Sequence, residues 1–262
     1  MSESILYNGT VRLSFDESGH RYKVSEATLV NGETVWSEQR AVPSITTILK
    51  VIDKSGPLIW WALGCAGDYL KANLKPGSSL DEIQISSLLQ GARMAHRHVS
   101  REACDVGTLA HAWIEDYLAG VPPALPVNEQ ARNACLAAQT WIGKSHYKVE
   151  STETRLYSRK YEYAGTCDAQ GIVATVCGRL SVVDWKTSKA IYPEYRFQTA
   201  AYAQAASEMT DREIRDRWIV RIGKDGVLEE LHLPVRELRA DLEAFLAAKT
   251  LYDRLFELGI IK

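Results

Sequence analysis

Three consecutive runs with the residue pattern of β-strands constrain the fold of this chain most. Residues 147–157, 163–176 and 180–186 are rich in Tyr, Val, Thr and Ile, which favour extended backbone. The segments on either side of this block carry apolar residues at helical spacing instead. We therefore expect three successive strands in a sheet that helices cover.

The elements predicted around these strands follow the order helix, three strands, helix, two strands, helix. The helices are expected at 128–144, 194–209 and 236–258. Lys224-Asp225-Gly226 has the composition of a hairpin turn between the last two strands. This order is typical of an α/β (α+β) domain with a central mixed β-sheet flanked by helices.

The N-terminal part predicts a separate architecture. Short β-type runs between residues 10 and 36, with DESG and NG as turns, predict a β-meander. Ser44 is placed to cap a helix that begins with ITTILKVI. Further helices are expected at 57–73, 81–102 and 106–119. We expect an N-terminal β-meander and helical lobe over 1–104, and a core domain over 105–262.

The overall charge gives no sign of a nucleic-acid partner. Lys plus Arg number 31 and Asp plus Glu number 33 in 262 residues, so the formal net charge is −2. A chain of this charge needs a local basic patch to attract phosphate. The five cysteines show no CxxC pair, and no apolar run reaches the roughly 18 residues of a membrane helix. We expect a soluble protein of a bacterial cytoplasm with free thiols and no membrane contact.

The segment 163–188 brings charged groups together. If its turn, Cys177-Gly178-Arg179, centres near residue 176, Asp168 lies opposite Asp184. Because side chains alternate along a strand, Asp184 and Lys186 share one face. Two close carboxylates repel each other, and a divalent cation such as Mg²⁺ removes that repulsion. The alternative is a surface hairpin with a cross-strand salt bridge.

Five motifs in this order resemble the RecB-type nucleases of the PD-(D/E)xK superfamily, which include phage-encoded exonucleases. They are GTLAH at 107–111, Glu153, GTCDAQG at 165–171, VVDWKTS at 182–188 and Gln198-x-x-x-Tyr202. The resemblance implies a restriction-endonuclease-like core. No G-x-x-x-x-G-K-[ST] loop is present, so the helicase part of RecB is not expected.

The resemblance also implies a role for each matched residue. Asp168 and Asp184 would ligate metal, and Lys186 would be the catalytic lysine. His111 and the Trp185 carbonyl would complete the metal ligands. Glu153 would support them as a further catalytic carboxylate, with Glu150 as its rival.

The substrate would meet a second group of residues. The resemblance implies that Gln198 and Tyr202 orient the lysine and contact the DNA strand. Charge alone suggests a phosphate-binding patch, for which a solvated strand edge is the equal alternative. Its members would be Arg155, Arg159, Lys160, Lys189 and Arg196.

The sequence as a whole predicts a metal-dependent DNA nuclease. We expect a stand-alone exodeoxyribonuclease of DNA recombination, repair or phage DNA processing, with Mg²⁺ or Mn²⁺ as cofactor. A single-strand annealing protein is a candidate partner. No cysteine follows Lys186, so the iron–sulfur cluster of some relatives is not expected. An endonuclease, or a non-catalytic DNA-binding or assembly module on the same fold, stays open.

Overall fold

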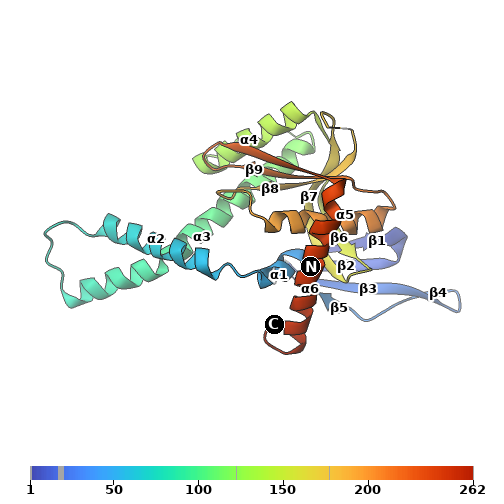
Figure 1. Ribbon diagram of the computed structural model, residues 1–262, viewed down its shortest axis with the longest axis horizontal. Coiled ribbons are helices and arrows are strands. Elements are labelled where there is room, and N and C mark those ends of the chain that lie inside the picture. Colours follow the sequence, from blue (N-terminus) through green and yellow to red (C-terminus); the bar gives the residue numbers. More distant parts are fainter. Residues whose placement is uncertain (1, 17–20, 122, 177, 262) are drawn as a thin grey trace. The chain divides into compact units, whose positions relative to one another are not determined.

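Two groups of contacts organise the chain. A computed structural model describes residues 2–16, 21–121, 123–176 and 178–261 (Figure 1). Contacts join Met1–Val51 and Ala110–Lys262 into one compact unit, here the core unit, and Ile52–Leu109 into a second, here the helical unit. The division at residue 104 expected from the sequence stays a prediction.

The core unit contains the expected mixed sheet, and its five strands follow the spatial order β10-β9-β8-β7-β6. β8 and β9 are parallel and every other neighbouring pair is antiparallel. The strands are β6 (Tyr147–Ser158), β7 (Tyr163–Val173), β8 (Leu180–Lys186), β9 (Asp216–Ile222) and β10 (Leu228–Pro234). The fold class and the order of elements predicted for this half are confirmed.

Helices lie against this sheet because parallel strands need a crossover connection. That connection is α5 (Glu194–Thr210), which runs from β8 to β9 and buries a row of alanines that permits close packing. α4 (Glu129–Ser145) contributes Trp141 to a core cluster with Trp185 and Trp218. α6 (Val235–Glu257) packs on α5. No helix in the described ranges is long and apolar enough to cross a membrane.

The N-terminal residues form a second, antiparallel sheet, as expected. Its strands are β1 (Ser2–Leu6), β2 (Val11–Asp16), β3 (Arg21–Val30), β4 (Glu33–Trp36) and β5 (Arg40–Val42). The expected NG turn is confirmed: Asn31 and Gly32 both have positive φ, 54° and 85°, as a tight hairpin turn between β3 and β4 requires. The expected DESG turn and Cys177 of the later turn fall at least partly outside the described residues.

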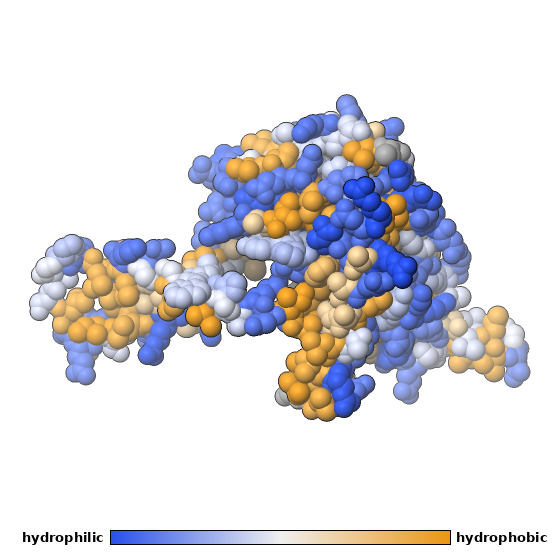
Figure 2. Space-filling model, viewed as in Figure 1, coloured by the Kyte–Doolittle hydropathy of each residue, from blue (hydrophilic) through white to orange (hydrophobic). Residues whose placement is uncertain are grey.

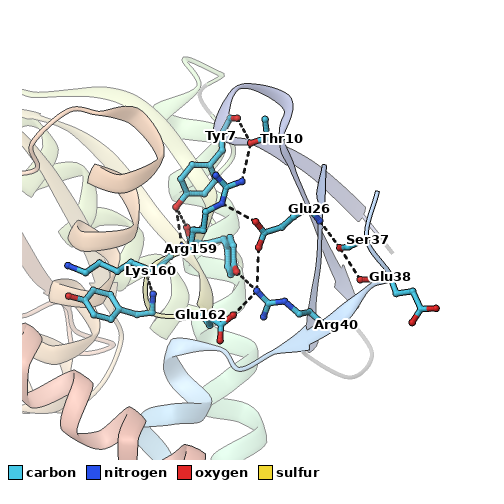
Figure 3. Close-up of polar contacts among 12 residues, drawn as sticks. Tyr7, Thr10, Glu26, Ser37, Glu38, Arg40, Arg159, Lys160 and Glu162 are labelled. Atoms are coloured by element: carbon cyan, nitrogen blue, oxygen red, sulfur yellow. Dashed lines mark hydrogen bonds and ion pairs between the residues drawn. The ribbon is translucent and has the colours of Figure 1, made fainter. Parts of the chain in front are cut away.

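A polar network connects this sheet to the end of β6 (Figure 3). The Glu26 carboxylate forms ion pairs with both Arg40 and Arg159. Arg40 also donates a hydrogen bond to the Tyr157 hydroxyl at 2.8 Å. The Tyr7 hydroxyl donates to the Tyr157 carbonyl. The network explains why residues 1–51 belong to the core unit rather than to the helices that follow them in sequence.

Ser44 caps the short helix α1 (Ile45–Ile48) as predicted, with its hydroxyl accepting the Thr47 N–H at 3.0 Å. The helical unit begins with α2 (Ser55–Asn73). The separate helices predicted at 81–102 and 106–119 are wrong, since α3 (Glu82–Leu118) is continuous. The residues between them, Ala-Cys-Asp, include neither Gly nor Pro, so nothing interrupts the helical hydrogen bonds.

The helical unit leaves apolar side chains at its surface (Figure 2). Leu58, Trp60 and Leu63 are 54%, 76% and 57% exposed. Two helices form too thin a layer to bury apolar residues on all sides. The inner positions of α3 are taken by the small residues Ala92 and Ala95 instead.

Replacing Asp241 on α6 tests the packing of the core most directly. Its carboxylate accepts Arg217 of β9 at 2.7 Å, and the Arg217 side chain is 1% exposed. We expect Asp241→Ala to lower the free energy of unfolding by about 3–5 kcal/mol, because it leaves a buried guanidinium without its counter-ion. Urea unfolding followed by tryptophan fluorescence measures the loss.

Glu243→Ala is the matched control on the same helix. Its partner Arg239 is 90% exposed, so we expect a change of about 0–1 kcal/mol. Equal losses in the two variants would contradict the structural role assigned to the Arg217–Asp241 pair.

Candidate metal centre

The β7–β8 ladder sets the geometry of the predicted site. Ala169 pairs with Val183 and Gln170 with Val182, so the next position brings Asp168 opposite Asp184, as the sequence predicted. The regular strand pairing ends at Ala169, and the Asp168 carboxylate accepts the Trp185 backbone N–H at 2.8 Å in place of a further strand bond. The expected register is therefore confirmed.

A bulge in β6 selects which glutamate faces Asp168. The β6–β7 register shifts by one residue between Val149 and Ser151. Beyond the shift Thr152 pairs with Ala169 and Thr154 with Cys167, so Glu153 lies opposite Asp168. Without the extra residue, alternation would have turned Glu153 to the other face.

The rival glutamate, Glu150, is at the bulge itself. Its carboxylate forms an ion pair with Arg212 at 2.7 Å, and this arginine lowers its pKa. Glu150 thus has a structural partner, whereas Glu153 stands across from Asp168. The structure favours Glu153 of the two.

Three ligand-type side chains converge at this position. One ligand atom each from His111, Glu153 and Asp168 lies within 4.8 Å of the others. His111 comes from the end of α3 within the core unit, and its Nδ1 is 3.7 Å from Asp168 Oδ2. Glu115, one helical turn further, is exposed.

Glu153 combines an unfavourable backbone conformation with unfavourable surroundings for its negative charge. Its backbone φ is +43°, a left-handed conformation that costs a residue with a side chain roughly 1–3 kcal/mol. The residue keeps solvent access, yet loss of water around its carboxylate and the nearby Asp168 charge raise its pKa to about 7. A bound cation would relieve the charge repulsion.

Asp184 is fully buried and is held by polar partners on two elements. Lys186 Nζ lies 2.7 Å from its Oδ2, and the Gln198 amide donates to its Oδ1 at 3.3 Å. Burial raises the pKa of the Asp184 carboxyl. Burial alone would lower the pKa of the Lys186 ammonium, but Asp184 and Asp168 outweigh it and raise that pKa. Lys186 therefore keeps its proton.

Residues on one face of α5 line the site. Gln198 and Tyr202, expected there, are buried, and the Gln198 amide also donates to the Tyr202 hydroxyl at 2.8 Å. The sequence analysis missed Tyr195, whose ring centroid is 4.7 Å from Lys186 Nζ. The signal was available, because 195, 198 and 202 follow the i, i+3, i+7 spacing of one helical face.

The donor set fits a hard divalent cation. Carboxylate oxygens are ligands that Mg²⁺ and Mn²⁺ prefer, and an imidazole is compatible with Mn²⁺. Oδ2 of Asp184 is buried and accepts no hydrogen bond among the described residues, with Lys186 as its ionic neighbour. The structure thus brings together His111, Glu153 and Asp168, while Asp184 is engaged by Lys186. Ligation by Asp184 and by the Trp185 carbonyl stays a prediction.

Two members of the phosphate-binding patch predicted from this region have partners within the fold. Arg196 pairs with Glu237 and Asp241 of α6, and Arg155 donates to Ser2 and Ser4 of β1. Their guanidinium groups are thus engaged within the fold, and their role as phosphate contacts stays a prediction. Lys189 is exposed and stays a candidate.

Comparison with known proteins gives only distant likenesses. No protein-family model and no curated protein matches the chain. A protein of Eubacterium rectale, provisionally assigned as an exonuclease, has 13% identity and a TM-score of 0.36, over 60% of this chain and 69% of that one. An alkaline exonuclease from Laribacter hongkongensis has 14% identity and a TM-score of 0.28, over 76% and 97%. The same enzyme with dAMP gives a TM-score of 0.29.

Proposed function

We propose that this protein is a metal-dependent deoxyribonuclease of the PD-(D/E)xK type that acts on DNA ends. The observation that carries the proposal is the convergence of His111, Glu153 and Asp168 beside a buried Asp184–Lys186 pair. DNA recombination, repair or phage DNA processing would be its setting.

The residues of the site divide the chemistry among them. His111, Glu153 and Asp168, with Asp184 and the Trp185 carbonyl as further candidates, would hold Mg²⁺ or Mn²⁺. Such a cation polarises a phosphoryl oxygen and lowers the pKa of an attacking water. Because Lys186 keeps its proton, it acts as a fixed positive charge and hydrogen-bond donor to the oxygens that gain charge during cleavage.

The remaining contacts keep Lys186 in place. Asp184 fixes the ammonium from one side, and the Tyr195 ring lies against it from another. The Gln198 amide fixes Asp184 in turn. This arrangement restricts the position of the charge before substrate binds, which is what electrostatic preorganisation requires.

The non-catalytic alternative explains this arrangement less well. Burying an ammonium and a carboxylate costs several kcal/mol per ion, and their attraction often fails to offset it. A DNA-binding module has no use for such a pair below its surface. An active centre has one, because a dry site strengthens the effect of each charge.

Lys186→Ala should reduce the rate constant for DNA cleavage by about 10²–10³-fold, the typical effect of losing one group that stabilises transition-state charge. The affinity for Mn²⁺ should stay close to that of the wild type. Single-turnover cleavage of end-labelled linear DNA and titration calorimetry measure the two quantities.

Two further variants serve as comparisons for Lys186→Ala. Asp168→Asn should lose metal affinity together with activity, because Asp168 belongs to the converging ligand group. Lys148→Ala, an exposed lysine on β6, should cleave at the wild-type rate. A Lys186→Ala protein that cuts DNA as fast as Lys148→Ala would remove the central residue of the proposal.

The metal dependence forms a second test. We expect Mn²⁺ to support faster cleavage than Mg²⁺, since imidazole is a better partner for Mn²⁺, and we expect Zn²⁺ not to replace either ion. His111→Ala should therefore reduce the Mn²⁺-supported rate more than the Mg²⁺-supported rate. His146→Asn is the control, because His146 is exposed and has a left-handed φ of 49° that Asn tolerates.

Rates are compared on linear and closed-circular DNA, which also separates an exonuclease from an endonuclease. Full cleavage in excess chelator would exclude a metal mechanism. Cleavage of the closed circle at the rate of the linear form would replace the exonuclease proposal by the endonuclease one.

A further inference from the structure

Three arginines form a row on α3 within the helical unit. Arg93, Arg97 and Arg101 follow each other at four-residue intervals, so they lie along one side of the helix. All three are exposed. The stretch of α3 between Glu82 and Glu102 contains no acidic residue, and Asp105, four residues after Arg101, forms no ion pair with it among the described residues.

Most other arginines of the protein are paired with a carboxylate. Among the described residues, Arg93, Arg97 and Arg101 form no ion pair with a carboxylate and no side-chain hydrogen bond. Twelve other arginines do have such a partner, namely Arg12, Arg40, Arg159, Arg179, Arg196, Arg212, Arg215, Arg217, Arg221, Arg236, Arg239 and Arg254.

The row works against the stability of its own helix. Like charges four residues apart destabilise a helix by about 0.2–0.5 kcal/mol for each pair, and no acidic residue on the helical unit offsets this through an ion pair with the row. Local stability therefore gives no reason for the three charges. An external polyanion would supply one.

We propose that Arg93, Arg97 and Arg101 bind the phosphate backbone of a DNA strand. The inference rests on the proposed function, since it names how a DNA nuclease of net charge −2 attracts its substrate. It is separate from the patch expected near the metal centre, where Arg155 and Arg196 are engaged within the fold.

The dimensions of the row suit a strand rather than a small anion. At 1.5 Å rise per residue, the three arginines extend over about 12 Å of helix, whereas phosphates recur about every 3.4 Å along one strand of a duplex. An exposed row offers no enclosure for a single phosphate. Guanidinium groups bind phosphate oxygens through paired hydrogen bonds, so each arginine can take one phosphate along the strand.

The test is the salt dependence of binding by the full-length protein. A variant that carries Arg93→Gln, Arg97→Gln and Arg101→Gln is compared with the wild type by fluorescence anisotropy, with chelator present to prevent cleavage. Losing three phosphate contacts should reduce the slope of log affinity against log salt by about 2 on a single strand and by about 2.7 on a duplex. The row prefers whichever of the two DNA forms, single strand or duplex, shows the larger loss of affinity in the variant at low salt.

The matched control removes the same charge from another helix. Arg236→Gln, Arg239→Gln and Arg254→Gln change exposed arginines of α6, and we expect the wild-type slope. A single Arg97→Gln variant should change the slope by about 0.7 on a single strand, which keeps the test valid if the triple variant does not fold. Unchanged slopes in the α3 variants, or an equal change in the α6 control, would overturn the proposal.

A short substrate separates this inference from the proposed function. Hydrolysis of bis(4-nitrophenyl) phosphate with Mn²⁺ needs the metal centre but no bound strand. The triple α3 variant should hydrolyse it at the wild-type rate while its cleavage of DNA at moderate salt falls. Loss of both activities would contradict a role in strand binding alone. A wild type that hydrolyses neither substrate but shows the expected slopes would refute the proposed function and leave the strand-binding site standing.

Discussion

The burial of the Asp184 carboxylate is the constraint on which the rest of the site depends. A carboxylate removed from water needs compensating charge and hydrogen-bond donors, and here Lys186 and Gln198 supply them. This demand links β8, which carries Asp184 and Lys186, to the helix that crosses over to the parallel strand β9. The crossover thus serves two purposes, since it covers the sheet and supplies the polar partner of its buried acid.

Much of the core unit could be predicted because its determinants are local. Alternation along β7 and β8 and the position of their turn were enough to bring Asp168 opposite Asp184. Helix spacing was enough for α5. These predictions depend on periods of 2 and 3.6 residues, which the sequence displays directly.

Other features escaped prediction because they depend on tertiary partners. Arg155 and Arg196 look like phosphate ligands in the sequence, and only the folded chain brings them to β1 and α6. The bulge that turns Glu153 toward Asp168 interrupts the period on which strand analysis relies. α3 was predicted as two helices because the short stretch between them carries no strong helical signal of its own. The unpaired arginines on α3 were not noticed because a charge count over the whole chain does not show where charges gather.

The left-handed backbone at Glu153 affects how the protein responds to substitution at this position, as well as its chemistry. A glycine there would relax the chain, and any uncharged residue would relieve the crowding of negative charge around Asp168. Substitution by glycine at this position therefore favours folding while it damages the site. Screens that select only for abundance or heat resistance would drift toward an inert protein, and a stabilised descendant would reveal that drift first at residue 153.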